Sequence, residues 1–169
     1  MEEIRNKVAE SALKVFDLED YFPSKKIVLL DVSHWLFQGF ILKESDFRTS
    51  LKDHDWNKYQ NTIVALHCST EAILPAWTFL LVASHLNQVG AEVFLGNEKE
   101  AIVAHYFKTI PHLDFKDYKQ APVILKGCSK KPVPEEAYLL ALEYLQPIAK
   151  SIMFGEACSA VPLYKEKKQ

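Results

Sequence analysis

Two stretches in the later part of the chain share one order of apolar and polar positions. Residues 61–69, NTIVALHCS, contain a β-branched apolar run that predicts a buried strand ending at Cys68. After a short loop, Pro75 suits the first turn of a helix, and residues 75–90 are strongly apolar and predict that helix. Residues 91–97, AEVFLGN, predict the next strand. The order is therefore strand, Cys-Ser pair, loop, proline, helix and strand.

The same order returns further along the chain. Residues 121–129, APVILKGCS, predict a strand that ends at Cys128. A proline then opens a helix that is expected to cover residues 134–150 and to bend at Pro147, with two glutamates in its first turn that favour the positive end of the helix dipole. Residues 151–159, SIMFGEACS, predict a strand that ends near the third Cys-Ser pair.

The remaining segments give weaker patterns. An apolar face predicts a helix over residues 5–16, and residues 44–56 and 98–110 predict two further helices. Residues 25–32 and 33–42 predict strands, the second with a glycine as a candidate bulge.

The alternation of strands and helices predicts the fold class, because strands separated by helices pair in parallel through right-handed crossovers. We expect an α/β protein with a largely parallel sheet, built from the two strand–helix–strand units and an additional N-terminal α/β segment. No low-complexity linker interrupts the sequence, so residues 1–169 are expected to form a single domain, with a disordered charged tail at residues 165–169.

Composition and charge indicate which partners and which cellular location to expect. The formal net charge of −2 offers no electrostatic reason to expect nucleic acid or an anionic membrane as a partner. The longest apolar run, residues 73–83, is too short to span a membrane, and the acidic N-terminal segment lacks the basic and apolar regions of a signal peptide. We therefore expect a cytoplasmic protein. Its three cysteines cannot all pair with one another, so the thiols are expected to be free, metal-bound or redox-active.

These cysteines are the main candidates for chemistry. Cys68, Cys128 and Cys158 each follow a predicted strand, and the carboxyl ends of parallel strands meet at one edge of a sheet, where ligands bind. Neighbouring strands lie about 4.8 Å apart, so thiolates from adjacent strands can share one metal ion or cluster. We therefore expect a three-cysteine site for an iron–sulfur cluster or zinc, both of which soft thiolates favour.

Residues beside the cysteines extend this candidate site. Gly127 would let backbone or a cluster approach Cys128 closely. His67 is a candidate ligand, although in a continuing strand its side chain would face away from that of Cys68. Contacts to the cofactor are also expected from the serine of each pair: Ser69, Ser129 and Ser159. A separate group of acids and histidines is a weaker candidate for metal binding or proton transfer: Asp31, His34, Asp53, His54 and Asp55.

The Cys-Ser segments also resemble a known family. Residues 54–77 (HDWNKYQNTIVALHCSTEAILPAW), 123–138 (VILKGCSKKPVPEEAY) and 150–165 (KSIMFGEACSAVPLYK) are similar to number 2480 in the domain-of-unknown-function series, a family of bacterial proteins. The resemblance covers nearly the whole chain and brings no catalytic residues with it. Because members are often encoded beside iron–sulfur assembly genes of the Suf type, the resemblance implies iron–sulfur assembly proteins as partners.

Three functions are consistent with the sequence. The first is a metal- or iron–sulfur-binding accessory protein whose site leaves one coordination position open for exchange. The second is a thiol or redox enzyme with Cys128 as nucleophile, its thiolate favoured by Lys126, Lys130 and Lys131. The third is a non-catalytic interaction domain in which the cysteines pack as small apolar side chains. The sequence contains no nucleotide-binding or hydrolase motif, and the recurring Cys-Ser setting favours the first function.

Overall fold

The computed structural model describes residues 13–127, 129–156 and 159–167 and shows an α/β protein with two separate sheets. Contacts divide the chain into two compact units. We call residues Pro23–Ala104 the inserted unit, because they interrupt the sequence of the other unit. That second unit, which we call the split unit, contains the chain up to Phe22 and again from His105.

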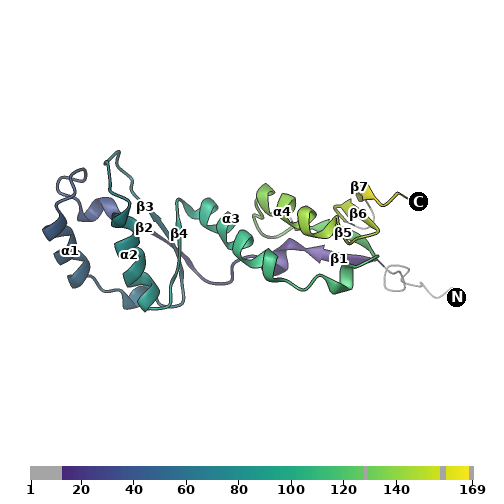
Figure 1. The fold of residues 1–169 in the computed structure, drawn as a ribbon, viewed down its shortest axis with the longest axis horizontal. Coiled ribbons are helices and arrows are strands. Elements are labelled where there is room, and N and C mark those ends of the chain that lie inside the picture. Colours follow the sequence, from purple (N-terminus) through teal and green to yellow (C-terminus); the bar gives the residue numbers. More distant parts are fainter. Residues whose placement is uncertain (1–12, 128, 157–158, 168–169) are drawn as a thin grey trace. The chain divides into compact units, whose positions relative to one another are not determined.

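The inserted unit holds a three-stranded parallel sheet in the order β2-β3-β4, drawn in purple to teal in Figure 1. Two α-helices and two short 3-10 helices belong to this unit, and a third α-helix begins in it. The elements in chain order are β2 (Ile27–Asp31), η2 (Val32–Trp35), α1 (Glu44–Asp53), η3 (Asn57–Tyr59), β3 (Ile63–His67), α2 (Trp77–Gln88), β4 (Glu92–Leu95) and α3 (Glu98–Thr109).

The split unit holds a four-stranded sheet in the order β1-β5-β6-β7, in which only the β6–β7 pairing is antiparallel among the strands described. Its helix α4 connects β5 to β6 (Figure 1). The elements are β1 (Lys14–Asp17), η1 (Leu18–Tyr21), η4 (Ile110–His112), η5 (Lys116–Tyr118), β5 (Pro122–Lys126), α4 (Glu135–Leu145), β6 (Ser151–Phe154) and β7 (Val161–Lys165).

The central strand of each sheet is buried on both faces, as expected for a parallel sheet covered by helices. In β3, Val64 and Leu66 pack into the cluster that includes residues of α1 and α2. Ile63 and Ala65 face the other way and pack with Ala101 of α3. This continuous burial explains why Cys68 and Cys128 are each preceded by an uninterrupted apolar run.

The three parallel strands of each unit are arranged in the same way, and the split unit adds the antiparallel strand β7. In each, the first strand ends at an aspartate that caps a 3-10 helix and pairs with the middle strand, and an α-helix then connects the middle strand to the third. The structural repeat therefore includes the N-terminal strands as well as the strand–helix–strand pattern visible in the sequence. The inserted unit enters the chain between the first and second strands of the split unit.

The predicted α/β class with largely parallel strands is confirmed, but the strands are divided between two sheets. The reason is that β1 and β2, which belong to the weakly patterned N-terminal part, each provide the first strand of a different sheet. The prediction that residues 1–169 form one domain stays a prediction.

Several predicted boundaries differ from the structure. Residues 14–17 form strand β1 instead of the end of a helix, because they pair with β5. Helix α4 ends at Leu145, since Pro147 has no N–H to continue it. Lys165 is the last residue of β7 and so belongs to a strand, not to the predicted tail.

Residues 33–42 also differ from their prediction as a strand. They contain the 3-10 helix η2 and a narrow hairpin in which Phe37 pairs with Ile41. Gln38 and Gly39 have positive φ angles of 52° and 78°, which reverse the chain where a bulge was expected.

Candidate functional site

Each unit places a Cys-Ser turn at the carboxyl end of its middle strand, next to the end of its first strand. In the inserted unit, Asp31 is paired in register with His67, and Cys68 follows. In the split unit, Asp17 is paired with Lys126, and Gly127 and Cys128 follow. Both turns therefore begin beside an aspartate that caps a 3-10 helix.

The turn of the inserted unit is held by Asp31. Its Oδ1 accepts hydrogen bonds from the backbone N–H groups of Ser33 (2.9 Å) and Ser69 (3.0 Å). The two serine hydroxyls lie 3.1 Å apart and bond to each other. Burial on its own would raise the pKa of Asp31, but the hydrogen bonds from Ser69 and Ser33 outweigh it and hold that pKa well below its usual range. The aspartate thus stays ionised and fixes the backbone just after Cys68.

Cys68 is engaged within the same turn. Its Sγ lies 3.3 Å from Oγ1 of Thr70, and the Thr70 hydroxyl donates to the carbonyl of Gly39 at 2.6 Å. Because a threonine hydroxyl has one hydrogen, Thr70 must accept from Cys68, and the thiol is the donor. His67 lies beside this network, with Nδ1 buried and without a hydrogen-bond partner among the described residues.

The turn of the split unit is held by a glutamate instead. Oε1 of Glu19, in η1, accepts from the N–H groups of Ser129 (2.6 Å), Lys130 (2.6 Å) and Lys131 (3.4 Å), and from the Ser129 hydroxyl (3.1 Å). These bonds, the Lys130 N–H first, outweigh burial and lower the pKa of Glu19. Lys131 also donates its ammonium to the Glu19 carbonyl at 3.0 Å.

An ion pair network lies at the same edge of the split sheet. Nζ of Lys126 is 3.2 Å from Oδ2 of Asp17 and 3.8 Å from Oε1 of Glu156. The hydrogen bond and charge of Asp17 raise the pKa of Lys126, with a smaller contribution from Glu156. The network therefore connects the ends of all three parallel strands of this sheet.

Gly127 is required by close packing at this edge. Its φ is +153°, and a Cβ at this position would lie 2.7 Å from Cβ of Leu18. A contact this short cannot be accommodated without a backbone shift. Backbone or a cluster was expected to approach Gly127, and in the structure the Cβ and backbone nitrogen of Leu18 would lie 2.7 and 3.3 Å from a Cβ placed there.

The three predicted thiol ligands are placed differently. Cys128 and Cys158 lie outside the described residues, but they follow β5 and β6, which are neighbours paired in parallel. Cys68 follows β3, which belongs to the other sheet. The expectation that the strands before all three cysteines share one sheet is therefore wrong for Cys68, and the convergence of Cys128 and Cys158 stays a prediction. No group of three His, Cys, Asp or Glu side chains arranged to hold a metal ion is found among the residues that are described.

The serines of the pairs have backbone roles. Ser69 and Ser129 donate their N–H groups to Asp31 and Glu19, and Ser159 donates its N–H to the carbonyl of Glu156 at 2.9 Å. All three bonds therefore shape the turns that carry the cysteines.

The weaker acid–histidine group is dispersed. Asp31 belongs to the Cys68 turn, and His34 is exposed on η2. His54 lies against Trp35 and Trp56, and burial followed by the charge of Lys58 lowers its pKa.

Sequence reasoning did not identify Glu19. A signal was present, because FDLED and LDVSH both place an aspartate at a strand end, and Glu19 and Ser33 occupy the same offset from it. The acceptor and donors of the Glu19 bonds are separated by 110 residues, so no local pattern connects them.

Within the described part of the chain, no helix combines the length and apolar character needed to cross a lipid bilayer. Neither the curated proteins nor the solved structures include a match to this sequence. Residues 2–166 match the family described as protein of unknown function (DUF2480), and the chain therefore belongs to that family.

Proposed function

We propose that the protein binds a metal ion or an iron–sulfur cluster through cysteine thiolates at the carboxyl edge of the split sheet, and acts as an accessory protein in iron–sulfur cluster assembly in the cytoplasm. The observation that supports this most is the 3.8 Å approach of Lys126 to Glu156. These residues precede Cys128 and Cys158 in the sequence, so the chain segments entering both Cys-Ser pairs lie side by side.

The segments leaving the two cysteines are anchored as well. After Cys128, the N–H group of Ser129 is bound by Glu19. After Cys158, the N–H group of Ser159 is bound by the Glu156 carbonyl. Such anchoring reduces the conformational freedom that ligand side chains lose on binding a metal.

The donor types fit the proposed cofactors. Soft thiolates bind zinc and iron–sulfur clusters. A bound cluster or zinc ion would supply an open position for exchange or ligand binding. The residues of this chain would hold it: Cys128 and Cys158, with Gly127, Ser129 and Ser159 shaping the turns.

The expectation that Cys68 is a third ligand, with His67 beside it, stays a prediction, because Cys68 belongs to the inserted unit. For Cys68 to ligate, its thiol must release the hydrogen bond to Thr70. The unpaired Nδ1 of His67 is available at the same strand end. The family resemblance supports the choice of iron–sulfur assembly proteins as partners.

The test is the metal content of anaerobically purified protein, measured as iron and zinc per chain together with the absorption spectrum. The wild type is compared with Cys128→Ser, Cys158→Ser and Cys68→Ser, and circular dichroism verifies that each variant folds. We expect Cys128→Ser and Cys158→Ser to lose most of the metal, and the metal content of Cys68→Ser tests whether Cys68 is also a ligand. A wild type that holds neither iron nor zinc after reconstitution would exclude the proposal.

A further inference from the structure

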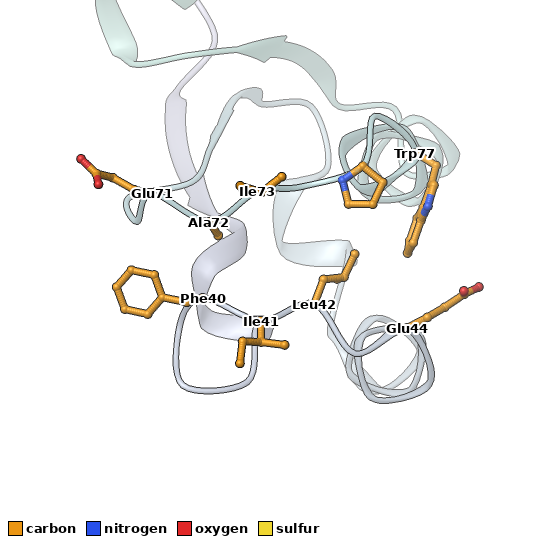
Figure 2. A pocket seen from close by; sticks show the side chains of 9 residues that line it. Phe40, Ile41, Leu42, Glu44, Glu71, Ala72, Ile73 and Trp77 are labelled. Carbon is orange, nitrogen blue, oxygen red and sulfur yellow. The ribbon is translucent and has the colours of Figure 1, made fainter.

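The inserted unit carries an open apolar groove next to its Cys-Ser turn network. The groove has a volume of about 670 Å³ and lies between the hairpin segment 40–42 and the loop 71–75. Figure 2 shows Phe40, Ile41 and Leu42 on one side and Ala72 and Ile73 on the other. The groove is lined by Phe40, Ile41, Leu42, Ala72, Ile73, Pro75 and Trp77, together with Glu44 and Glu71.

Several apolar side chains around the groove are exposed to solvent. Ile73 is 96% exposed, and Phe40 and Ile41 are 57% and 51% exposed. Phe37, at the base of the same hairpin, is 45% exposed. Single exposed apolar residues need no explanation, but a contiguous patch around a groove marks a binding surface.

The walls of the groove are fixed to each other before any partner binds. The hairpin is closed by two backbone hydrogen bonds between Phe37 and Ile41, at 2.8 and 3.0 Å. The Thr70 hydroxyl donates to the Gly39 carbonyl at 2.6 Å and so joins the hairpin to the start of the opposite loop. A preformed site costs less ordering on binding than a flexible one.

The charges around the groove indicate the kind of partner. The two charged lining residues are both acidic, and Figure 2 shows them at opposite ends of the groove. Glu44 is paired with Arg48 at 2.8 Å, whereas Glu71 has no hydrogen-bond or ion-pair partner among the described residues. Lys43 lies over the Phe37 ring, 3.4 Å from its centroid. The Glu71 end is therefore the uncompensated negative end.

We infer that this groove docks a short segment of a partner protein that presents apolar side chains to Phe40 and Ile73 and a lysine or arginine to Glu71. A basic residue is the complement of the free carboxylate. An acidic end disfavours nucleic acid and anionic lipid as occupants. No cysteine lines the groove, and the inference does not depend on metal binding.

The test uses a phage-displayed library of random dodecapeptides selected on the wild-type protein, with Ile73→Ser as the counter-target. We expect enriched sequences to combine apolar side chains with a lysine or arginine. The strongest peptide is then synthesised, and its Kd is measured by fluorescence anisotropy for each variant. Ile73 is almost fully exposed, so Ile73→Ser removes little buried contact and should fold as the wild type does.

The expected changes in Kd are graded. Loss of the Ile73 side chain should weaken binding about 10- to 100-fold, the range for burying one large apolar side chain. Glu71→Gln should weaken it about two- to fivefold, with a smaller salt dependence than the wild type. Leu80→Ser is the matched control: Leu80 is 68% exposed on α2 but does not line the groove, and its replacement should leave Kd unchanged.

Three results would overturn the inference. The first is a selection in which no peptide is enriched on the wild type relative to Ile73→Ser. The second is an enriched peptide that is acidic or binds Ile73→Ser as tightly as the wild type. The third is a wild-type dimer, seen by sedimentation, that Ile73→Ser dissociates, because the occupant would then be a second copy of this chain. Metal content is measured in parallel and should be the same in Ile73→Ser and the wild type.

Discussion

The two units use different residues to accept the backbone N–H of the serine in their Cys-Ser pairs. Each has a first strand ending at an aspartate, a 3-10 helix, and a middle strand followed by a Cys-Ser pair whose serine N–H needs an acceptor. In the inserted unit the strand-end aspartate, Asp31, provides that acceptor. In the split unit Asp17 is paired with Lys126, and Glu19 accepts the N–H groups instead.

This difference follows from the geometry at the strand ends. The split unit has an additional residue, Gly127, between the strand and its cysteine, and Leu18 packs directly against that glycine. In the split unit the acceptor is therefore Glu19 of η1, two residues beyond the strand-end aspartate. Its longer side chain reaches three consecutive N–H groups. Two carboxylates thus meet the same requirement that backbone donors be paired.

The largest expected effect is at the glycine that distinguishes the split unit. Gly127→Ala should destabilise the protein by about 3 kcal/mol or more, because it combines an unfavourable φ with a steric clash against Leu18. Gly90→Ala is the control, since Gly90 also has a positive φ of +74° but has open space around it. The free energy of unfolding of that variant, measured by urea denaturation, should be only about 1–2 kcal/mol below that of the wild type. Equal losses would show that the packing against Leu18 is not tight.

The two carboxylates should also differ in their contribution to stability. Glu19→Gln should lower the urea midpoint more than Asp31→Asn, because Glu19 accepts from three N–H groups and a hydroxyl whereas Asp31 accepts from two N–H groups. Denaturation at pH 7 with the two variants in parallel measures this. If Asp31→Asn were the more damaging change, the inserted turn would depend more on its carboxylate than the split turn does.

Acid should weaken both turns. The folded-state pKa of each carboxylate is lowered, so its contribution to stability is fully present above the unfolded-state pKa and is lost as the pH falls through the folded-state pKa. Wild-type stability should therefore decline as the pH falls below about 4.5. The decline should be shallower in Glu19→Gln and in Asp31→Asn. A variant that keeps the full wild-type slope would show that its carboxylate does not contribute to the acid dependence.

The smallest effect concerns the hydrogen bond of Cys68. Thr70→Val removes the oxygen that accepts from the thiol, whereas Thr70→Ser keeps it. Loss of a bond of about 1 kcal/mol corresponds to an approximately fivefold faster alkylation of Cys68 by iodoacetamide in Thr70→Val. The Thr70→Ser rate should match the wild type, as followed by mass spectrometry of the peptide containing Cys68. An unchanged rate in Thr70→Val would mean that the thiol is not restrained by this bond.

Much of the secondary structure could be predicted because it depends on local pattern. The buried runs before Cys68 and Cys128 form β3 and β5, and helices α2 and α4 follow the two prolines, which were expected to be their first residues. Apolar runs and proline restrict the backbone within a few residues, whatever the rest of the chain does.

The sequence by itself determined which segments are strands and helices around the Cys-Ser pairs, and that the strands run largely in parallel. Only the tertiary structure decided that these strands form two sheets, that β1 pairs with β5, and that Glu19 holds the turn after Cys128. The physical reason is that strand partners and carboxylate acceptors are selected by contacts between segments far apart in the chain, 110 residues in the case of Glu19 and Ser129. The local pattern of either segment does not determine which distant segment it contacts.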